Sequence, residues 1–174
     1  MNAGTGLGAV GDVIRSVAFL TPDGRVTETG REELDFQYRG LHGRKGHVVL
    51  GAVFRLRRNG ASPGELKERA REILAERRKR QPDHGGGWSA GCFFKNPPDG
   101  PPAGALIDRA GLKGVRVGGA MVSPRHANFI VNTGDAAAAD ILALKDRIQE
   151  TVRDRFGVRL SPEGEIVGEE RHPV

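Results

Sequence analysis

The sequence is poor in aromatic residues and cysteine, and it contains no long apolar run. Phe, Trp and Tyr make up 5% of its 174 residues, so we expect a core built mostly from aliphatic side chains. The single cysteine, Cys92, excludes a disulfide within the chain and fits a reducing, cytoplasmic location. No apolar stretch approaches the roughly 18 residues that a membrane-spanning helix needs. The first residues have neither the basic nor the apolar region of a secretory signal.

The charge balance is basic, but the charges are not segregated. The 27 Lys and Arg residues outnumber the 22 Asp and Glu residues, which gives a net charge of +5. This balance suits a polyanionic partner such as nucleic acid, a membrane surface or a nucleotide diphosphate, or it carries no function at all. Acidic residues interrupt the basic ones, as in K-E-R-A-R-E at residues 67–72. Together with the scarce aromatics, this argues against a nucleic-acid or membrane partner. No pattern predicts a metal site.

The residues before position 60 are predicted to be mostly β-structure. Apolar and β-branched residues indicate strands over residues 12–20, 26–29 and 47–56. T-P-D-G-R at residues 21–25 predicts the turn of a hairpin, and residues 30–34 predict one helical turn. Because about sixty residues of β-structure make a marginal core, we expect this part to belong to a larger sheet.

The remainder is predicted to combine helices with short strands. A helix should begin at S-P-G-E, residues 62–65, which matches a capping box, and give one apolar face. A short helix is expected over residues 103–110 and a long one over residues 135–156. The long helix should bury a stripe made of Ile141, Leu144, Ile148, Val152 and Phe156. Strands are expected over residues 115–122, 127–132, 158–160 and 165–167. The pattern predicts an α+β fold with a boundary near residue 60.

The segment S-A-G-C-F-F-K-N-P at residues 89–97 combines reactive and polar side chains on an expected loop. A neutral thiol at Cys92 can donate a proton, while Lys95 and Asn96 can hold an anionic or carbonyl-rich substrate. Loops held by a rigid scaffold are where functional groups concentrate. A lone cysteine is more often a small buried apolar residue, so the segment by itself leaves both readings open.

Five sets of motifs, in order, resemble the UDP-N-acetylenolpyruvoylglucosamine reductase (MurB) family over almost the whole chain. They are N-A-G-T-G (2–6), E-E-L-D-F-Q-Y-R (32–39), S-A-G-C-F-F-K-N-P (89–97), A-G-L-K-G-V-R-V-G-G-A-M-V-S with H-A-N-F-I-V-N (110–123 and 126–132), and R-F-G-V-R-L-S-P-E (155–163). The resemblance implies part of a flavin-binding domain over residues 1–60 and an α+β substrate-binding domain over residues 61–174. It implies an enzyme of peptidoglycan synthesis that reduces UDP-N-acetylglucosamine enolpyruvate to UDP-N-acetylmuramate, using NADPH and FAD.

The resemblance also implies roles for individual residues. Cys92 matches the proton donor, and Arg39 and Glu163 match the residues at the substrate carboxylate, with Glu165 as a rival to Glu163. The residues that would lie against the flavin are Asn2, Ala3, Gly4 and Gly6. The residues that would bind the UDP-sugar are Tyr38, Lys95, Asn96, Lys113 and His126. Lys113 is expected at the diphosphate, and a capping or core role is the open alternative for His126.

The chain departs from the family pattern in two ways. The family has a flavin-binding region with a Gly-rich pyrophosphate loop upstream of the first motif. We therefore expect a truncated form, a mispredicted start or one half of a split protein whose other half is a separate polypeptide. Leu41 stands where the family usually has Ser. The alternative function is a non-catalytic UDP-sugar-binding module left after loss of the flavin domain.

Overall fold

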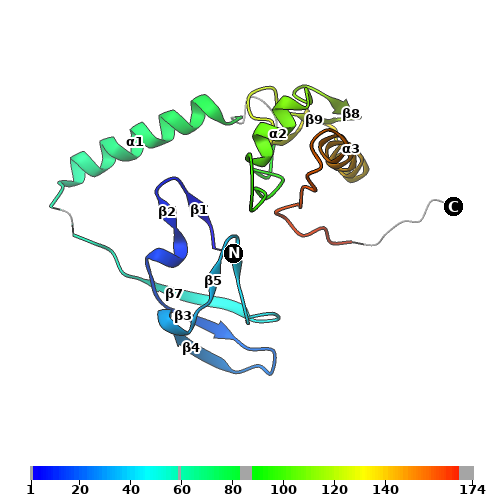
Figure 1. Ribbon diagram of the computed structural model, residues 1–174. Helices are drawn as coiled ribbons and strands as arrows, with labels where there is room; N and C mark the ends of the chain where they lie inside the picture. The colour runs from blue at the N-terminus through cyan, green and yellow to red at the C-terminus, as the bar shows by residue number, and fades with distance from the viewer. Residues whose placement is uncertain (1, 59, 83–87, 169–174) are drawn as a thin grey trace. The chain divides into compact units, whose positions relative to one another are not determined.

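The computed structural model describes residues 2–58, 60–82 and 88–168 of the chain. Contacts divide the chain into two compact units, Met1–Ser62 and Pro63–Val174, whose elements are labelled in Figure 1. Strands dominate the first unit, and helices with short strands make up the second, so the predicted α+β class is confirmed. Within the described ranges, no helix is long and apolar enough to cross a membrane.

A three-stranded antiparallel sheet forms the centre of the first unit. Strand β3 (Ile14–Leu20) pairs with β4 (Val26–Gly30) on one side and with β7 (Val48–Phe54) on the other. The backbone N–H of Thr21 donates to Arg25 O at 2.8 Å and closes the turn between β3 and β4. The predicted hairpin and the third strand are therefore confirmed. The first strand begins later than predicted because Val10–Asp12 form a 3₁₀ turn, η1.

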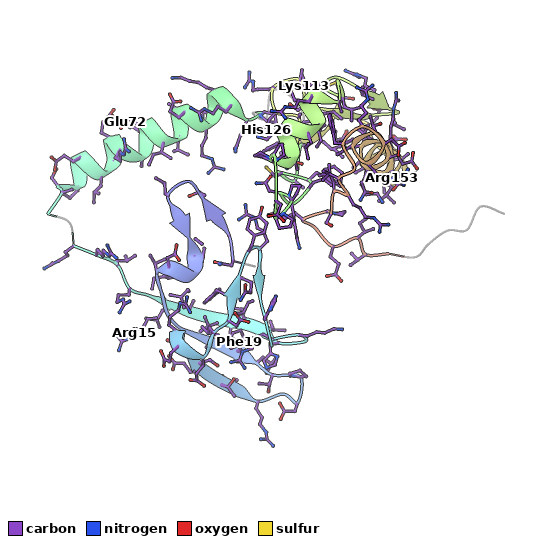
Figure 2. The ribbon with its side chains drawn as sticks, viewed as in Figure 1. Arg15, Phe19, Glu72, Lys113, His126 and Arg153 are labelled. Atoms are coloured by element: carbon purple, nitrogen blue, oxygen red, sulfur yellow. The ribbon has the colours of Figure 1, made fainter. Side chains whose placement is uncertain are left out.

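The core of this unit is small. Its buried apolar side chains are Ile14, Val17, Phe19 and Leu34 (Figure 2 labels Phe19). The predicted helical turn is the 3₁₀ turn η2 (Arg31–Glu33), which ends at Leu34. All seven residues of β7 are exposed, and its five large apolar side chains are between 48 and 59% exposed. Among the described residues β7 is also an edge strand of its sheet, and an edge strand of this kind is a surface on which a further strand can pair.

Two short hairpins complete the first unit. Their strands are β1 (Gly4–Thr5), β2 (Gly8–Ala9), β5 (Phe36–Gln37) and β6 (Gly40–Leu41). The side chain of Asn2 joins the start of the chain to the second hairpin. Its Nδ2 donates to Gln37 O at 3.2 Å, and its Oδ1 accepts the N–H of Gly11 at 2.9 Å. Asn2 therefore links the backbone beside the first hairpin to the second hairpin.

Helix α1 (Pro63–Arg80) opens the second unit and begins where the capping box predicts. None of its residues is buried, and the apolar face predicted from the spacing lies at the surface, with Leu66 and Leu74 each 50% exposed. At its C-terminal end, Nη1 of Arg125 donates to Arg78 O at 3.2 Å and to Gln81 O at 3.3 Å. A guanidinium in this position satisfies carbonyls that have no partner further along the helix.

The main core lies in the second unit. Helices α2 (Ala103–Arg109) and α3 (Ala138–Phe156) pack with a sheet of order β10-β9-β8, whose strands are β8 (Arg116–Val117), β9 (Ala120–Val122) and β10 (Ile130–Asn132). The predicted stripe of α3 is buried at Leu144, Ile148 and Val152. Phe156, which was predicted to belong to the stripe, is 39% exposed because it lies in the last turn, beyond the edge of the core.

Residues 115–122 form a hairpin rather than the single predicted strand. The chain reverses at Gly118 and Gly119, and Gly118 adopts φ 49°, which an L side chain rarely takes. A Cβ on Gly119 would lie 2.4 Å from the backbone N of Ala136. The carboxylate of Asp140 accepts the N–H of Gly119 at 3.1 Å and fastens this turn to the start of α3.

The two predicted strands after α3 are also wrong. Residues 158–160 and 165–167 are irregular, although Leu160 is buried at 1% exposure. Its strand-type pairing within the described part of the chain is limited to an isolated bridge between Pro162 and Phe94. Its hydrophobic residues read as a strand because Leu160 packs into the core, and burial of that kind does not require a ladder of hydrogen bonds.

Candidate active site

The segment that contains Cys92 lies between two other segments of the second unit. Isolated bridges pair Cys92 with Phe129 on one side and Phe94 with Pro162 on the other. The N–H of Phe93 donates to Asn128 O at 2.7 Å. The motif is therefore irregular, as predicted, but backbone contacts on both sides hold it in place.

Cys92 and Glu163 come from neighbouring segments, although 70 residues separate them in the sequence. The N–H of Glu163 donates to Phe93 O at 2.8 Å, and the N–H of Lys95 donates to Ser161 O at 2.8 Å. Cys92 is exposed and Glu163 is half-buried, so a substrate can reach the thiol. The rival Glu165 lies two residues beyond and is exposed. Of the two carboxylates, Glu163 is the one whose own backbone is bonded to the cysteine segment.

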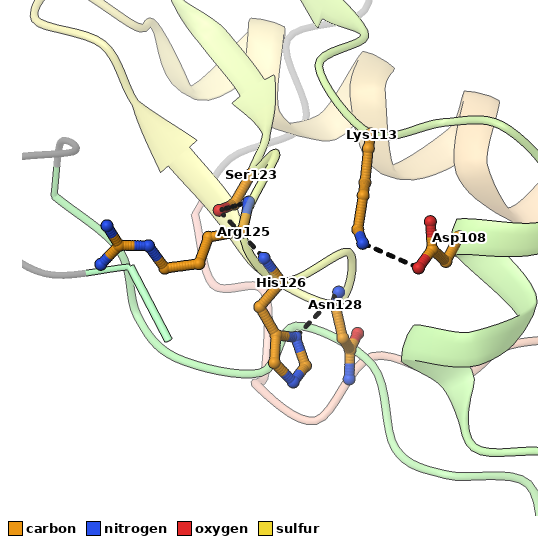
Figure 3. A network of polar contacts seen from close by, with 6 residues as sticks. All are labelled: Asp108, Lys113, Ser123, Arg125, His126 and Asn128. Carbon is orange, nitrogen blue, oxygen red and sulfur yellow. Dashed lines mark hydrogen bonds and ion pairs between the residues drawn. The ribbon is translucent and has the colours of Figure 1, made fainter. Parts of the chain in front are cut away.

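Polar contacts in the second unit involve Lys113 and His126, two of the predicted site residues (Figure 3). Lys113 Nζ is 2.7 Å from Asp108 Oδ2, in an ion pair at the surface. The buried hydroxyl of Ser123 accepts the backbone N–H groups of Arg125 at 3.2 Å and His126 at 3.3 Å. These bonds shape the turn that presents His126. Asp108, in α2, and Ser123, after β9, were not singled out from the sequence, because a short polar side chain gives no signal of its partners.

The ring of His126 is half-buried and has a defined hydrogen-bonding pattern. Its Nδ1 accepts the N–H of Asn128 at 3.3 Å, which leaves Nε2 to carry the proton of the neutral ring. Its edge packs on Phe129, with ring centroids 4.8 Å apart. Burial lowers the pKa of His126 below its ordinary value of 6.5, and the Lys113 cation adds to this, while a hydrogen bond with the histidine's own backbone opposes it. His126 is therefore a neutral hydrogen-bond donor at neutral pH.

Lys95 and Asn96 follow the cysteine and differ in their surroundings. Lys95 is half-buried, and Asn96 is exposed. Oδ1 of Asn96 accepts the N–H of Ala103 at 3.1 Å, which ties the motif to the first residue of α2. Asn96 therefore positions the loop through its side-chain carbonyl oxygen.

Two of the site residues predicted in the first unit, Tyr38 and Gly4, lie against Arg39. Arg39 adopts φ 55°, an uncommon conformation for a residue with a side chain, and its guanidinium lies 5.2 Å from the ring centroid of Tyr38. A Cβ on Gly4 would lie 3.1 Å from Arg39 Nη1, so the guanidinium packs on the backbone of β1. The unusual backbone at Arg39 is the kind of local strain that functional sites hold.

Leu41, which replaces the usual Ser of the family pattern, has a structural role. It pairs with Phe36 across β5 and β6 and packs against the small core of the first unit. A hydroxyl at this position would therefore sit against apolar side chains, and the leucine contributes to the packing instead. Within the described residues, no group of three or more His, Cys, Asp or Glu side chains is placed to hold a metal ion.

The chain is similar to known proteins over nearly its whole length. A model of the UDP-N-acetylenolpyruvoylglucosamine reductase C-terminal domain matches residues 81–167. UDP-N-acetylenolpyruvoylglucosamine reductases from Desulfosudis oleivorans and Geobacter metallireducens are 48% and 46% identical, over 97% and 98% of this chain but only 55% of each relative.

A solved structure agrees with these relatives. The crystal structure of UDP-N-acetylenolpyruvylglucosamine reductase (MurB) from Thermus caldophilus matches with a TM-score of 0.76 and 42% identity, over 95% of this chain and 57% of that protein. The chain thus spans about half the length of the relatives that it matches. By its matched domain, its relatives and its fold, the chain belongs to the UDP-N-acetylenolpyruvoylglucosamine reductase family.

Proposed function

We propose that this chain supplies the proton donor and the substrate-binding groups for the reduction of UDP-N-acetylglucosamine enolpyruvate to UDP-N-acetylmuramate. The hydrogen bond from Glu163 N–H to Phe93 O supports this most directly, because it sets the backbone of a carboxyl-bearing residue beside the segment that carries the thiol. Family membership supports the substrate class. The proposal extends to NADPH as reductant and FAD as the carrier of hydride.

The residues at the start of the chain fit contact with a flat flavin ring. Nothing lies within 4 Å of a Cβ added to Gly6, so a ring can approach the backbone closely there. Asn2, Ala3, Gly4 and Gly6 would hold the flavin, with Arg39 packed on Gly4 close by. When bound, FAD would supply the hydride that the vinyl carbon of the substrate receives.

Cys92 would complete the reduction by donating a proton to the substrate carbon next to the carboxylate. The S–H bond breaks, a C–H bond forms, and the resulting thiolate is reprotonated from solvent. A cysteine thiol ordinarily has a pKa of about 8.5, so most of it carries the proton at neutral pH. This chemistry needs a neutral thiol and differs from that of nucleophilic cysteines, which act as thiolates.

Arg39 and Glu163 would act on the negative charge that develops at the enolate and carboxylate of the substrate. A guanidinium is always charged and offers a planar pair of donors that matches a carboxylate. A carboxyl group that can share a proton stabilises an enolate oxygen by hydrogen bonding. Glu163 is half-buried, which strengthens such a bond relative to one made in water.

The UDP group would bind the polar groups of the second unit. Lys113 and the Nε2–H of His126 are suited to diphosphate oxygens, and Lys95 follows the thiol by three residues in the same segment. Tyr38 and Asn96 complete the proposed substrate-binding set. A diphosphate would compete with Asp108 for Lys113, because the pair is exposed and contributes little by itself.

We further propose that a separate polypeptide with the flavin-binding region completes the enzyme. Strand β7 supports this, because it exposes five large apolar side chains and stands at the edge of its sheet in the described part of the chain. Mixing the chain with the part of the Desulfosudis oleivorans reductase that it does not match, together with FAD, tests the whole proposal. NADPH oxidation that depends on UDP-N-acetylglucosamine enolpyruvate and on both chains is expected. The absence of such turnover, with FAD bound, would contradict it.

A second candidate is a UDP-sugar-binding module without catalysis. It is favoured by the network around Lys113 and His126, which lies within the second unit and needs no residue of the first. Turnover with the complementary polypeptide separates the two, and an absorption spectrum of the chain after mixing with FAD and desalting shows whether the chain holds flavin by itself. A colourless chain that binds UDP tightly and gains no turnover from the complementary polypeptide would favour the module.

A further inference from the structure

Asn128 is a buried polar residue at the centre of the candidate site. Its side chain is bonded at both ends to one residue: Oδ1 accepts the N–H of Phe94 at 3.0 Å, and Nδ2 donates to Phe94 O at 2.8 Å. Asn128 is 4% exposed and Phe94 is 1% exposed, so water does not compete for these bonds. The Asn128 side chain thus bonds both backbone polar groups of Phe94, as a neighbouring strand would, in the segment that carries Cys92.

The main chain of Asn128 extends the same contacts. Its carbonyl oxygen accepts the N–H of Phe93 at 2.7 Å, and its own N–H donates to Nδ1 of His126 at 3.3 Å. Phe93 in turn accepts the N–H of Glu163. Asn128 therefore bonds directly to His126 and to the segment that carries Cys92, and it is linked to Glu163 through Phe93.

We propose that Asn128 is the positioning residue that fixes Cys92 and Lys95 relative to His126 and Glu163. The inference rests on the proposed roles of those residues. The two hydrogen bonds between the Asn128 side chain and the Phe94 backbone, called the clamp below, can be tested without turnover. Cys92 and Lys95 lie two residues before and one residue after Phe94, so movement of Phe94 displaces both. An amide is needed because it both accepts and donates, and a carboxylate or an apolar side chain leaves at least one buried backbone group of Phe94 without a partner.

The substitution Asn128→Asp gives the proposal a specific signature. A protonated carboxyl still offers one acceptor and one donor, so the clamp persists, whereas the ionised form cannot donate to Phe94 O. Burial raises the pKa of a carboxyl above its ordinary value of about 4, which brings this step into a measurable range. The variant should therefore gain a pH-dependent clamp that the unmodified chain lacks.

The test follows the backbone amide resonances of Cys92 and Lys95 between pH 4 and 8, and the affinity for UDP in the same samples. His126, Glu163, Lys95 and Lys113 are ionisable site residues of this unit and are present in every sample, so the unmodified chain provides the baseline. Asn132→Asp is the matched control, because Oδ1 of Asn132 only accepts, from Gly134 N–H at 2.8 Å and Ala136 N–H at 3.0 Å. An ionised carboxylate keeps both of those bonds.

The expected result is an added titration step at Cys92 and Lys95 in Asn128→Asp alone, with UDP binding at least fivefold weaker above the step than below it. Resonances that follow the unmodified chain at every pH would overturn the proposal. If Asn128→Asp does not fold, hydrogen exchange of the unmodified chain decides instead. The Phe94 amide and the side-chain amide of Asn128 should then exchange at least a hundredfold more slowly than in an unstructured peptide, and rapid exchange of either would overturn the clamp. If the unmodified chain does not bind UDP, the proposed function fails at that point, while the resonances still decide on Asn128.

Discussion

Glu163 donates its backbone N–H to the carbonyl oxygen of Phe93 at 2.8 Å, and this bond joins two parts of the sequence that are 70 residues apart. Phe93 follows Cys92 directly, so the proposed proton donor and the proposed carboxyl group are linked through main chain rather than through mobile side chains. Catalytic groups held in this way keep their spacing when the substrate binds, which lowers the cost of reaching the reactive geometry.

The first prediction concerns the proton donor. In the enzyme completed by the flavin-binding polypeptide, Cys92→Ala should lower the rate of substrate reduction about 10²–10⁴-fold, the usual contribution of a general acid. NADPH should still bleach the flavin, because that step does not need the thiol. Cys92→Ser, which keeps a donor, should retain part of the activity in a stopped-flow assay. Normal turnover of Cys92→Ala would show that another group donates the proton.

The sequence predicted most helices and strands of this chain. The predictions failed at a hairpin that turns at two glycines and in the irregular segments after α3. The strands β3, β4 and β7 and the helices α1 and α3 follow from periodic apolar residues and capping signals. The hairpin at Gly118 and Gly119 does not, because its requirement is the nearness of Ala136 and Asp140, which only the fold brings about.

The candidate site shows the same division. Motifs pointed to Cys92, Glu163 and His126, whose chemistry can be named from the residue type. The partners that place them could not be found in this way, because Asn128 and Ser123 are ordinary loop residues until their bonds to Phe94 and to the His126 turn are seen. The apolar strand β7 was predicted, but its exposure depends on what packs against it, which the local sequence does not contain.

The second prediction concerns stability and the hairpin between β8 and β9. A methyl group added by Gly119→Ala would lie 2.4 Å from the backbone N and 2.6 Å from Cα of Ala136, so backbone has to move. We expect a loss of about 1–3 kcal/mol in the free energy of unfolding, measured with urea. Gly164→Ala is the control, since nothing lies within 4 Å of its added Cβ. Equal stability of the two variants would mean that the turn adapts without cost.

The third prediction follows from the lowered pKa of His126. Because burial disfavours the charged ring, the folded chain binds a proton less readily than the unfolded chain does. The stability of the folded chain that depends on a neutral His126 is therefore fully present above the unfolded pKa of about 6.5. It is lost as pH falls through the lower pKa of His126 in the folded chain. Urea unfolding should show decreasing stability from pH 7 to pH 5. His126→Gln, which cannot titrate, should remove this part of the slope, and the exposed His42→Gln should keep it.

The fourth prediction concerns Lys113. Removing its charge with Lys113→Met should weaken UDP binding about tenfold by calorimetry, as expected for the loss of one cation at a diphosphate. Asp108→Asn should strengthen binding, because the lysine no longer has a carboxylate 2.7 Å away that competes with the ligand. Lys145→Met is the matched control, since Lys145 forms an ion pair of the same length with Asp146 on α3. Equal losses in the two lysine variants would place the diphosphate elsewhere.

The fifth prediction concerns the exposed strand β7. Val48 and Leu50 are 56% and 53% exposed, so replacing both with Thr should change the stability of the isolated chain by less than about 1 kcal/mol. The same change should weaken association with the flavin-binding polypeptide at least tenfold, because burying these side chains is expected to drive that contact. Val26→Thr, on the opposite edge strand β4 and 69% exposed, is the control for a general loss of apolar surface. Sedimentation of the mixed chains measures the association of each variant. Undiminished association of the β7 variant would mean that the two polypeptides meet through another surface.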